Sequence, residues 1–163
     1  MTLFLGDEAA TLAAGARLGR RLQAVALRDP PSVGVHIHLR GQLGAGKTTL
    51  VRGLLRELGV SGAVKSPAYT LVEPYQASGL HLFHFDLYRI ADPEELELLG
   101  ARDHFVPGAV CLFEWPERGE HWLPRPDLTL HLRPVGDGRG LLVEAAGALG
   151  KALSQALAAG NVS

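Results

Sequence analysis

Hydrophobic residues recur along this chain with two spacings, and the switching between them predicts an α/β protein. Over residues 8–27, apolar side chains return every three or four positions while arginines gather on the opposite face, as in an amphipathic helix packed on a sheet. Residues 33–40 alternate instead, with aliphatic side chains at the odd positions and His36 and His38 facing the other way, as in a strand. Further helices are expected over residues 48–58, 93–99 and 148–158, and further strands over residues 3–5, 70–75, 80–87, 109–114, 128–132 and 141–143.

Short polar segments with glycine separate two pairs of these strands and predict hairpins. Residues 76–79 (QASG) separate one pair, and residues 136–138 (GDG) lie between the last two strands. Hairpins join antiparallel strands, whereas strand–helix–strand units join parallel ones. We therefore expect one domain over residues 1–163, a three-layer α/β arrangement with a mixed, mostly parallel central sheet and antiparallel hairpins.

The amino-acid composition limits the cellular compartments and the classes of partner that we expect. Sixteen Lys and Arg nearly balance 17 Asp and Glu, so the net charge of −1 gives no general attraction for nucleic acid. Cys111 is the single cysteine, which excludes an internal disulfide, and its apolar neighbours indicate a buried structural residue. No apolar run approaches the roughly 20 residues that span a bilayer, and residues 1–7 lack the features of a secretory signal. We expect a cytoplasmic protein without membrane association.

A glycine-rich segment carries the strongest chemical signal in the chain. Residues 41–48 read GQLGAGKT and match the phosphate-binding pattern G-x-x-x-x-G-K-[ST]. The segment follows a predicted strand and opens a predicted helix, so its backbone amides and the positive helix end face an anion. This context predicts a P-loop NTPase fold, with ATP preferred because no N-K-x-D segment is present to bind guanine. The loop residues expected to contact the nucleotide are Gly44, Ala45, Gly46, Lys47, Thr48 and Thr49.

The side chains around this loop have distinct expected roles. Lys47 would bridge the β- and γ-phosphates, Thr48 would offer its hydroxyl to Mg²⁺, and Thr49 would reach the α-phosphate. Mg²⁺ also requires a carboxylate at the end of a buried strand beside the P-loop strand. Glu114 and Asp86 both end strand-like runs, and the more uniformly apolar run favours Glu114 for the metal. The second acid would then orient or deprotonate the attacking water.

Beyond the P-loop, an ordered series of motifs resembles the bacterial TsaE family (also called YjeE), ATPases of tRNA threonylcarbamoyladenosine biosynthesis. The resemblance covers nearly the whole chain, including the first helix with Thr11. Its motifs are residues 66–75 (SPAYTLVEPY), 84–89 (HFDLYR), 94–96 (EEL) with Gly100, and 113–117 (FEWPE).

The resemblance implies roles that the residue pattern alone does not supply. It makes Thr48 and Glu114 the Mg²⁺ ligands and Asp86 a second essential acid near the γ-phosphate. Thr11 would lie at the adenine end of the pocket, and Arg139 in the last hairpin would close over the base.

The sequence does not fix the roles of two further positions. Trp115 would either lie close to the nucleotide or anchor the core. Ala68 stands where the family usually has threonine, so a hydroxyl contact with the metal or γ-phosphate is missing, although Ser66 and Thr70 remain. We expect Ala68 to alter turnover slightly without abolishing function.

The resemblance also implies partners and a cellular role. Proteins of this kind support the TsaD and TsaB subunits, which transfer a threonylcarbamoyl group to adenosine 37 of tRNA. The small ATPase, weak alone, uses ATP binding and hydrolysis to reset that complex between turnovers and meets tRNA indirectly. The alternatives are a small P-loop kinase of a metabolite, for which Arg89 and Arg102 are available, and a nucleotide-dependent binding switch.

Overall fold

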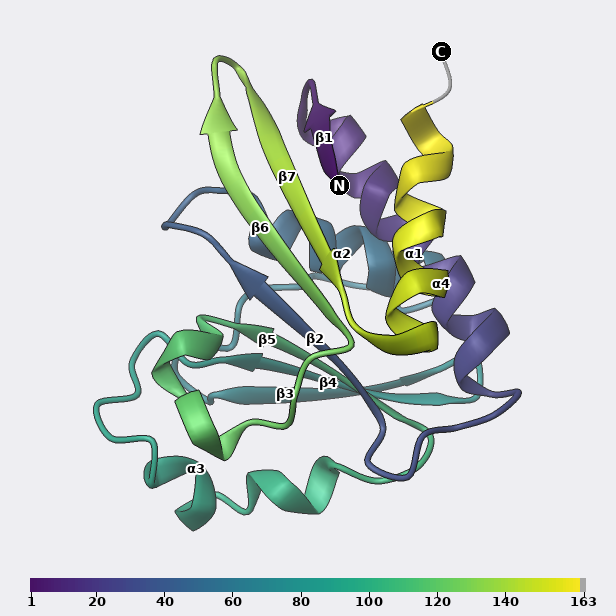
Figure 1. Ribbon diagram of the computed structural model, residues 1–163. Coiled ribbons are helices and arrows are strands. Elements are labelled where there is room, and N and C mark those ends of the chain that lie inside the picture. Colours follow the sequence, from purple (N-terminus) through teal and green to yellow (C-terminus); the bar gives the residue numbers. More distant parts are fainter. Residues whose placement is uncertain (162–163) are drawn as a thin grey trace.

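A single mixed sheet organises the molecule (Figure 1). The computed structural model describes residues 1–161, so the last two residues of the predicted domain lie outside it. The strands are β1 (Thr2–Leu5), β2 (Val35–Arg40), β3 (Val72–Ala77), β4 (Leu80–Asp86), β5 (Ala109–Glu114), β6 (Leu128–Val135) and β7 (Gly138–Ala145). The helices are α1 (Glu8–Ala26), α2 (Lys47–Glu57), α3 (Glu95–Leu98) and α4 (Gly147–Ala158), with short 3₁₀ segments that include residues 101–104 and 116–118.

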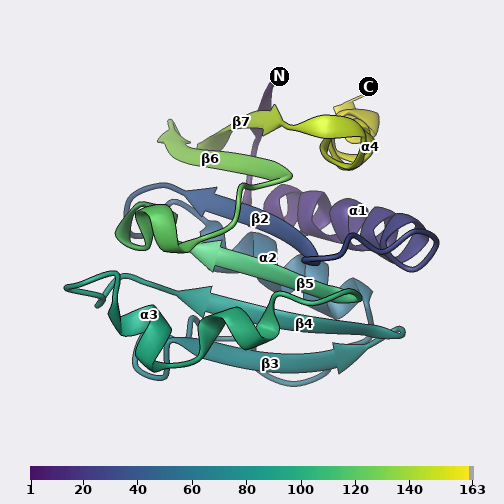
Figure 2. The same ribbon diagram turned by 60° about the horizontal axis from the view of Figure 1, so that its bottom comes forward.

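The strand order confirms the predicted mixed α/β sheet with a parallel centre. The order is β1-β7-β6-β2-β5-β4-β3, and β6, β2, β5 and β4 run parallel to one another. The outer pairs β3–β4, β6–β7 and β1–β7 are antiparallel. Helix α2 lies behind the sheet and α3 in front of it, while α4 packs against α1 and β7 (Figure 2).

Local signals in the sequence fix several element ends. Asp7 caps α1, because its side chain accepts a hydrogen bond of 2.7 Å from the amide of Ala10. Gly59 ends α2 with a φ of 99°, and the amide of Val60 bonds to the Leu55 carbonyl, as in a glycine-terminated helix. The β3–β4 turn contains only Ser78 and Gly79, since their positive φ angles fit a two-residue hairpin.

Several predicted elements differ in extent from those observed; the strand predicted over residues 70–75, for example, is β3 (Val72–Ala77). The predicted helix 93–99 is α-helical only over α3 (Glu95–Leu98), because the amides of residues 95–97 bond to carbonyls three positions back. The side chain of Asp92 caps this segment as predicted, accepting the amide of Glu94 at 3.0 Å. Strands β6 and β7 extend further toward their shared turn than residues 128–132 and 141–143, and they remain paired as far as Val135 and Gly138. The polar and glycine residues near that turn hide this pairing from a hydrophobic pattern.

Two buried clusters lie on opposite faces of the sheet. The larger one joins the inner faces of α1, α2 and α4 to the sheet. The smaller one lies under the α3 segment and includes Cys111 and Phe113. Burial raises the pKa of the Cys111 thiol to about 12, in keeping with the predicted structural role. His36 and His38 are buried strand residues whose rings pack against Phe113.

We predict that Gly53→Ala destabilises the fold although alanine favours helices. Helices α1 and α2 cross closely, so a Cβ at Gly53 would overlap the Leu12 carbonyl oxygen. Overpacking of this kind typically costs about 1–3 kcal/mol, which exceeds the ~1 kcal/mol gain in helix propensity. Urea unfolding should show that loss, whereas Gly6→Ala, whose added Cβ would lie 3.9 Å from Phe4, should change stability by less than about 0.5 kcal/mol. An unchanged or raised stability for Gly53→Ala would contradict the close crossing.

We also predict a pH-dependent stability that His38 controls. Burial, with smaller contributions from Arg40 and His36, lowers the pKa of His38 to about 4. The unfolded chain therefore binds a proton between pH 6.5 and 4 that the folded chain does not, and the free energy of unfolding falls as pH falls through that window. Between pH 7.5 and 5.0, wild type should lose about 2 kcal/mol more than His38→Leu in urea titrations. The exposed His81 serves as the control, and His81→Gln should retain the wild-type pH dependence.

Candidate functional site

The P-loop forms a turn that leads directly into α2. It follows β2, and Gly41, Gly44 and Gly46 all have positive φ angles. At Gly41 a side chain would also overlap the Leu132 carbonyl, so this position requires glycine for space as well as conformation. Since α2 begins at Lys47, its unpaired amides and positive end face the hollow outside the loop.

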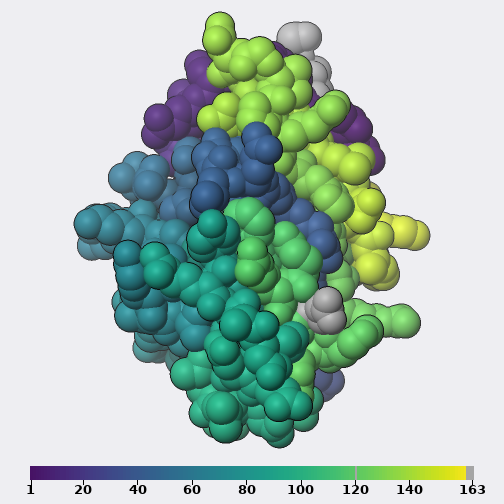
Figure 3. All heavy atoms as spheres, turned by 90° about the vertical axis from the view of Figure 1, so that its left-hand side faces the viewer, coloured from purple at the N-terminus to yellow at the C-terminus, as the bar shows by residue number. Residues whose placement is uncertain are grey.

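That hollow is a pocket of about 310 Å³ on the edge where β2, β4 and β5 end. Figure 3 views this edge, where the blue residues around the P-loop lie beside the teal and green segments that follow β4 and β5. The pocket lining contains nearly all of the predicted phosphate and metal residues. It consists of Leu43, Gly44, Ala45, Gly46, Lys47, Thr48, Thr49, Ser66, Ala68, Asp86, Tyr88, Glu114, Trp115 and Arg139.

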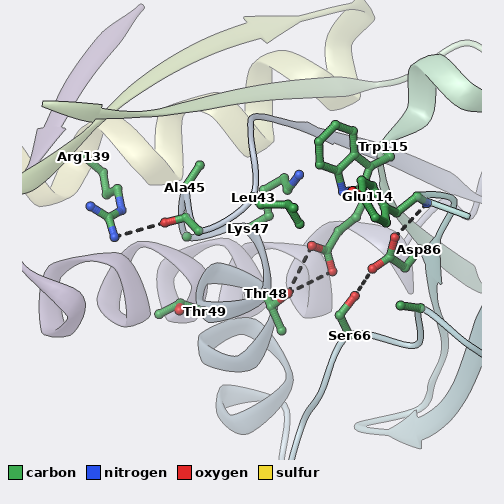
Figure 4. A pocket seen from close by; sticks show the side chains of 14 residues that line it. Leu43, Ala45, Lys47, Thr48, Thr49, Ser66, Asp86, Glu114, Trp115 and Arg139 are labelled. Carbon is green, nitrogen blue, oxygen red and sulfur yellow. Dashed lines mark hydrogen bonds between the residues drawn. The ribbon is translucent and has the colours of Figure 1, made fainter.

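Both predicted acids reach this pocket from neighbouring strands. Asp86 and Glu114 are paired in the parallel register of β4 and β5, and they are 4% and 2% exposed. The Thr48 hydroxyl lies 3.1 and 3.2 Å from the two carboxylate oxygens of Glu114 (Figure 4). The structure therefore brings the predicted metal pair, Thr48 and Glu114, into direct contact.

Asp86 is held from two sides. The Ser66 hydroxyl donates to Oδ2 of Asp86, and the amide of Tyr88 donates to Oδ1 at 3.0 Å (Figure 4). Ser66 belongs to the loop between α2 and β3, so this bond ties that loop to the end of β4. Ala68 also lines the pocket, which means that a hydroxyl at this position would face the same space.

Lys47 lies between the loop and an aromatic ring. Its ammonium donates to the Gly41 carbonyl and lies 3.7 Å from the centre of the Trp115 ring. Burial lowers the pKa of Lys47, against the opposing effect of the nearby acids, of which Glu114 is the strongest. Trp115 also packs against the smaller buried cluster, so it is both a pocket residue and a core contact.

The predicted adenine-end residues gather at the other end of the loop. Thr11, Thr49 and Arg139 line a small hollow of about 100 Å³ that adjoins the main pocket. Thr11 is almost fully buried, and its hydroxyl bonds to the Asp7 carbonyl at 3.3 Å. Arg139 donates to the Gly44 carbonyl at 3.2 Å and so ties the β6–β7 hairpin to the P-loop (Figure 4).

The sequence analysis did not assign Leu43 and Tyr88 of the pocket lining to the site, and it also missed His84, which contacts the site from behind. The Nε2 atom of His84 lies 2.6 Å from Oε2 of Glu114, and His84 is fully buried. The strand pattern did indicate that His84 lies near Asp86, because residues 84 and 86 of one strand face the same side of the sheet. Without the pairing of β4 with β5, however, nothing in the sequence connects His84 with Glu114.

The donor set at the pocket fits Mg²⁺ bound together with phosphate. Among residues 1–161, no group of three or more His, Cys, Asp or Glu is placed to hold a metal ion. Mg²⁺ takes oxygen ligands and usually completes its shell with water and substrate phosphates. A hydroxyl and a single carboxylate, Thr48 and Glu114, suit that arrangement.

A larger hollow lies elsewhere and contains none of the predicted site residues. It measures about 480 Å³ and is lined by Arg17, Arg20 and Arg21 of α1 with Gln155 and neighbouring alanines. The candidate site is therefore identified by its chemistry and not by its volume. In the described part of the chain, no helix has the length and apolar character needed to cross a membrane.

Comparisons of the sequence and of the structure with known proteins point to the same family. Residues 5–140 match the family model described as threonylcarbamoyl adenosine biosynthesis protein TsaE. The tRNA threonylcarbamoyladenosine biosynthesis protein TsaE of Haemophilus influenzae is 43% identical over 93% of both chains. Its namesake from Bacillus subtilis is 40% identical over 61% of both chains. The crystal structure of B. subtilis YdiB superposes with a TM-score of 0.75 and 28% identity, covering 99% of this chain and 95% of the other. The chain belongs to the TsaE family.

Proposed function

We propose that this chain is a Mg²⁺-dependent ATPase that supports the TsaD–TsaB complex in forming N6-threonylcarbamoyladenosine at position 37 of tRNA. The observation that carries the ATPase proposal is the contact between Thr48, at the first turn of α2, and Glu114, at the end of β5. The names of the relatives support the pathway. ATP binding and hydrolysis would reset the complex between turnovers.

In this proposal the P-loop binds the triphosphate. Residues 44–49 line the pocket, and the positive end of α2 with its unpaired first amides would stabilise phosphate oxygens there. When nucleotide binds, the Lys47 ammonium would leave the Gly41 carbonyl and donate instead to oxygens of the β- and γ-phosphates. Thr11 and Arg139 enclose the adenine end.

Thr48 and Glu114 would hold Mg²⁺. The bound ion would neutralise charge on the β- and γ-phosphates as the terminal bond breaks. Asp86 then orients the attacking water and accepts its proton, and its bonds to Ser66 and to the Tyr88 amide keep the carboxylate in place.

The distribution of cations explains why activity should depend on partners. Among the described residues, Arg139 is the one arginine that lines the main pocket, and it is bound to Gly44 at the end away from Glu114. An arginine supplied at the γ-phosphate raises hydrolysis by P-loop proteins by roughly 10³- to 10⁵-fold. We infer slow hydrolysis alone and activation by TsaD–TsaB, in the cytoplasm and without membrane association.

The architecture favours this reading over a metabolite kinase. Such a kinase commonly places a helical acceptor-binding insertion after the P-loop helix, whereas α2 is followed here by a loop and the β3–β4 hairpin. The third possibility, a nucleotide-dependent switch, differs from the proposal only in negligible hydrolysis.

We predict that ATP hydrolysis rises at least tenfold when the TsaB–TsaD heterodimer is added. Lys47→Ala and Glu114→Ala should each lower the stimulated rate by about 100-fold or more, equivalent to about 2.7 kcal/mol of transition-state stabilisation. The matched controls are Lys151→Ala on α4 and Glu144→Ala on β7, whose exposed ion pair with His131 lies outside the pocket lining. If the heterodimer leaves turnover unchanged and binds no ATP-loaded chain, the tRNA-modification role is refuted and phosphate acceptors should be sought.

We predict that Arg139→Ala weakens ATP binding about tenfold, or 1.4 kcal/mol, because the β6–β7 hairpin loses its bond to the P-loop. Arg133→Ala is the control, since Arg133 is exposed on the same hairpin and lines neither nucleotide hollow. Calorimetric titration with Mg·ATP measures both affinities. Equal affinities for the two variants would show that Arg139 does not contribute to ATP binding.

A further inference from the structure

We propose that His84 is a positioning residue that fixes the Glu114 carboxylate for Mg²⁺ binding. The inference rests on the proposed function, because it assigns a role toward the ion that Thr48 and Glu114 would hold. Its basis is a short, fully enclosed contact: Nε2 of His84 lies 2.6 Å from Oε2 of Glu114, with side chains 0% and 3% exposed.

The strand register places His84 behind the pocket. Asp86 pairs with Glu114 and His84 with Leu112 in the parallel β4–β5 ladder. Side chains two positions apart on a strand share a face, so His84 lies one step below Asp86 and diagonally beside Glu114. His84 does not line the pocket, whereas Glu114 does. The imidazole therefore acts on the pocket through the carboxylate and has no direct access to nucleotide.

The surroundings of the ring determine which nitrogen donates. Nδ1 of His84 is buried and has no hydrogen-bond partner among residues 1–161. A buried N–H without a partner is strongly unfavourable, so the proton belongs on Nε2, where the Glu114 carboxylate accepts it. His84 is thus the donor and Oε2 of Glu114 the acceptor.

This bond makes the two oxygens of Glu114 unequal. Oε2 accepts from His84 and lies 3.2 Å from the Thr48 hydroxyl, while Oε1 has the Thr48 contact alone at 3.1 Å. Oε1 therefore keeps more of its capacity to accept a ligand. A free glutamate side chain loses conformational entropy when it is ordered, and the bond from His84 imposes that order before any ion binds.

Bonds that orient metal ligands typically change metal affinity by about 10- to 100-fold when they are removed. The matched test pair is His84→Gln and His84→Asn, which share an amide and differ by one methylene. The glutamine amide extends about as far as Nε2 of histidine and keeps the donor, whereas the asparagine amide ends near the position of Nδ1. His84→Leu removes the donor altogether and serves as a third variant if asparagine unfolds the chain.

The measurement is the affinity for a fluorescent ATP analogue, first in EDTA and then across a Mg²⁺ titration. We expect His84→Asn and His84→Leu to raise the Mg²⁺ concentration at half-effect by about tenfold. His84→Gln should remain within about threefold of wild type, and all variants should match wild type in EDTA. A merely structural role would change nucleotide binding in EDTA as well.

The inference is overturned if the glutamine and asparagine variants, or glutamine and leucine if asparagine unfolds, share one Mg²⁺ dependence. It is also overturned if the EDTA affinities fall in parallel with the Mg²⁺ response. A wild-type chain that binds the analogue without any Mg²⁺ effect refutes instead the Mg²⁺ site of the proposed function, and the assignment of His84 falls with it.

Discussion

The parallel register of β2, β5 and β4 is the constraint on which the site depends. It pairs Leu39 with Glu114 and Glu114 with Asp86, so the acids lie side by side at the edge where the P-loop begins. A slip of one residue in either pairing would turn a carboxylate to the opposite face of the sheet. Apolar side chains on both faces of β5 oppose such a slip, because all six of its residues are buried.

The close crossing of α1 and α2 is the second constraint. Glycines at positions 15 and 53 let the two backbones approach, and the contact orients α2 so that its first turn faces the ends of β4 and β5. The site thus combines a rigid sheet edge with a rigid helix end. Arg139 and Ser66 add single bonds that tie a hairpin and a loop to this frame.

The sequence predicted those parts of the site that local patterns encode. The P-loop, Glu114 and Asp86 were identifiable because glycine spacing and apolar runs that end in an acid are local features. The contact of His84 with Glu114 and that of Arg139 with Gly44 span 30 and 95 residues, and only the fold makes them visible. Helix 93–99 was predicted too long because its apolar spacing does not distinguish an α-helical turn from the shorter-range bonds that residues 95–97 make to carbonyls three positions back.

The balance of buried charge argues that nucleotide and metal bind together. The deepest part of the pocket holds two nearly buried carboxylates, Asp86 and Glu114, against one ammonium, Lys47. A triphosphate that enters this space alone adds several negative charges beside those acids, and the cost of such repulsion grows as water is excluded. A divalent cation would reverse the local balance, while Lys47 and the amides at the start of α2 would stabilise the remaining phosphate charge. Among the described residues, no arginine lines the acid end of the pocket, because Arg139 is bound to Gly44 at the opposite end. The same excess of acids would therefore favour both the proposed Mg²⁺ and a partner that supplies a further cation for turnover.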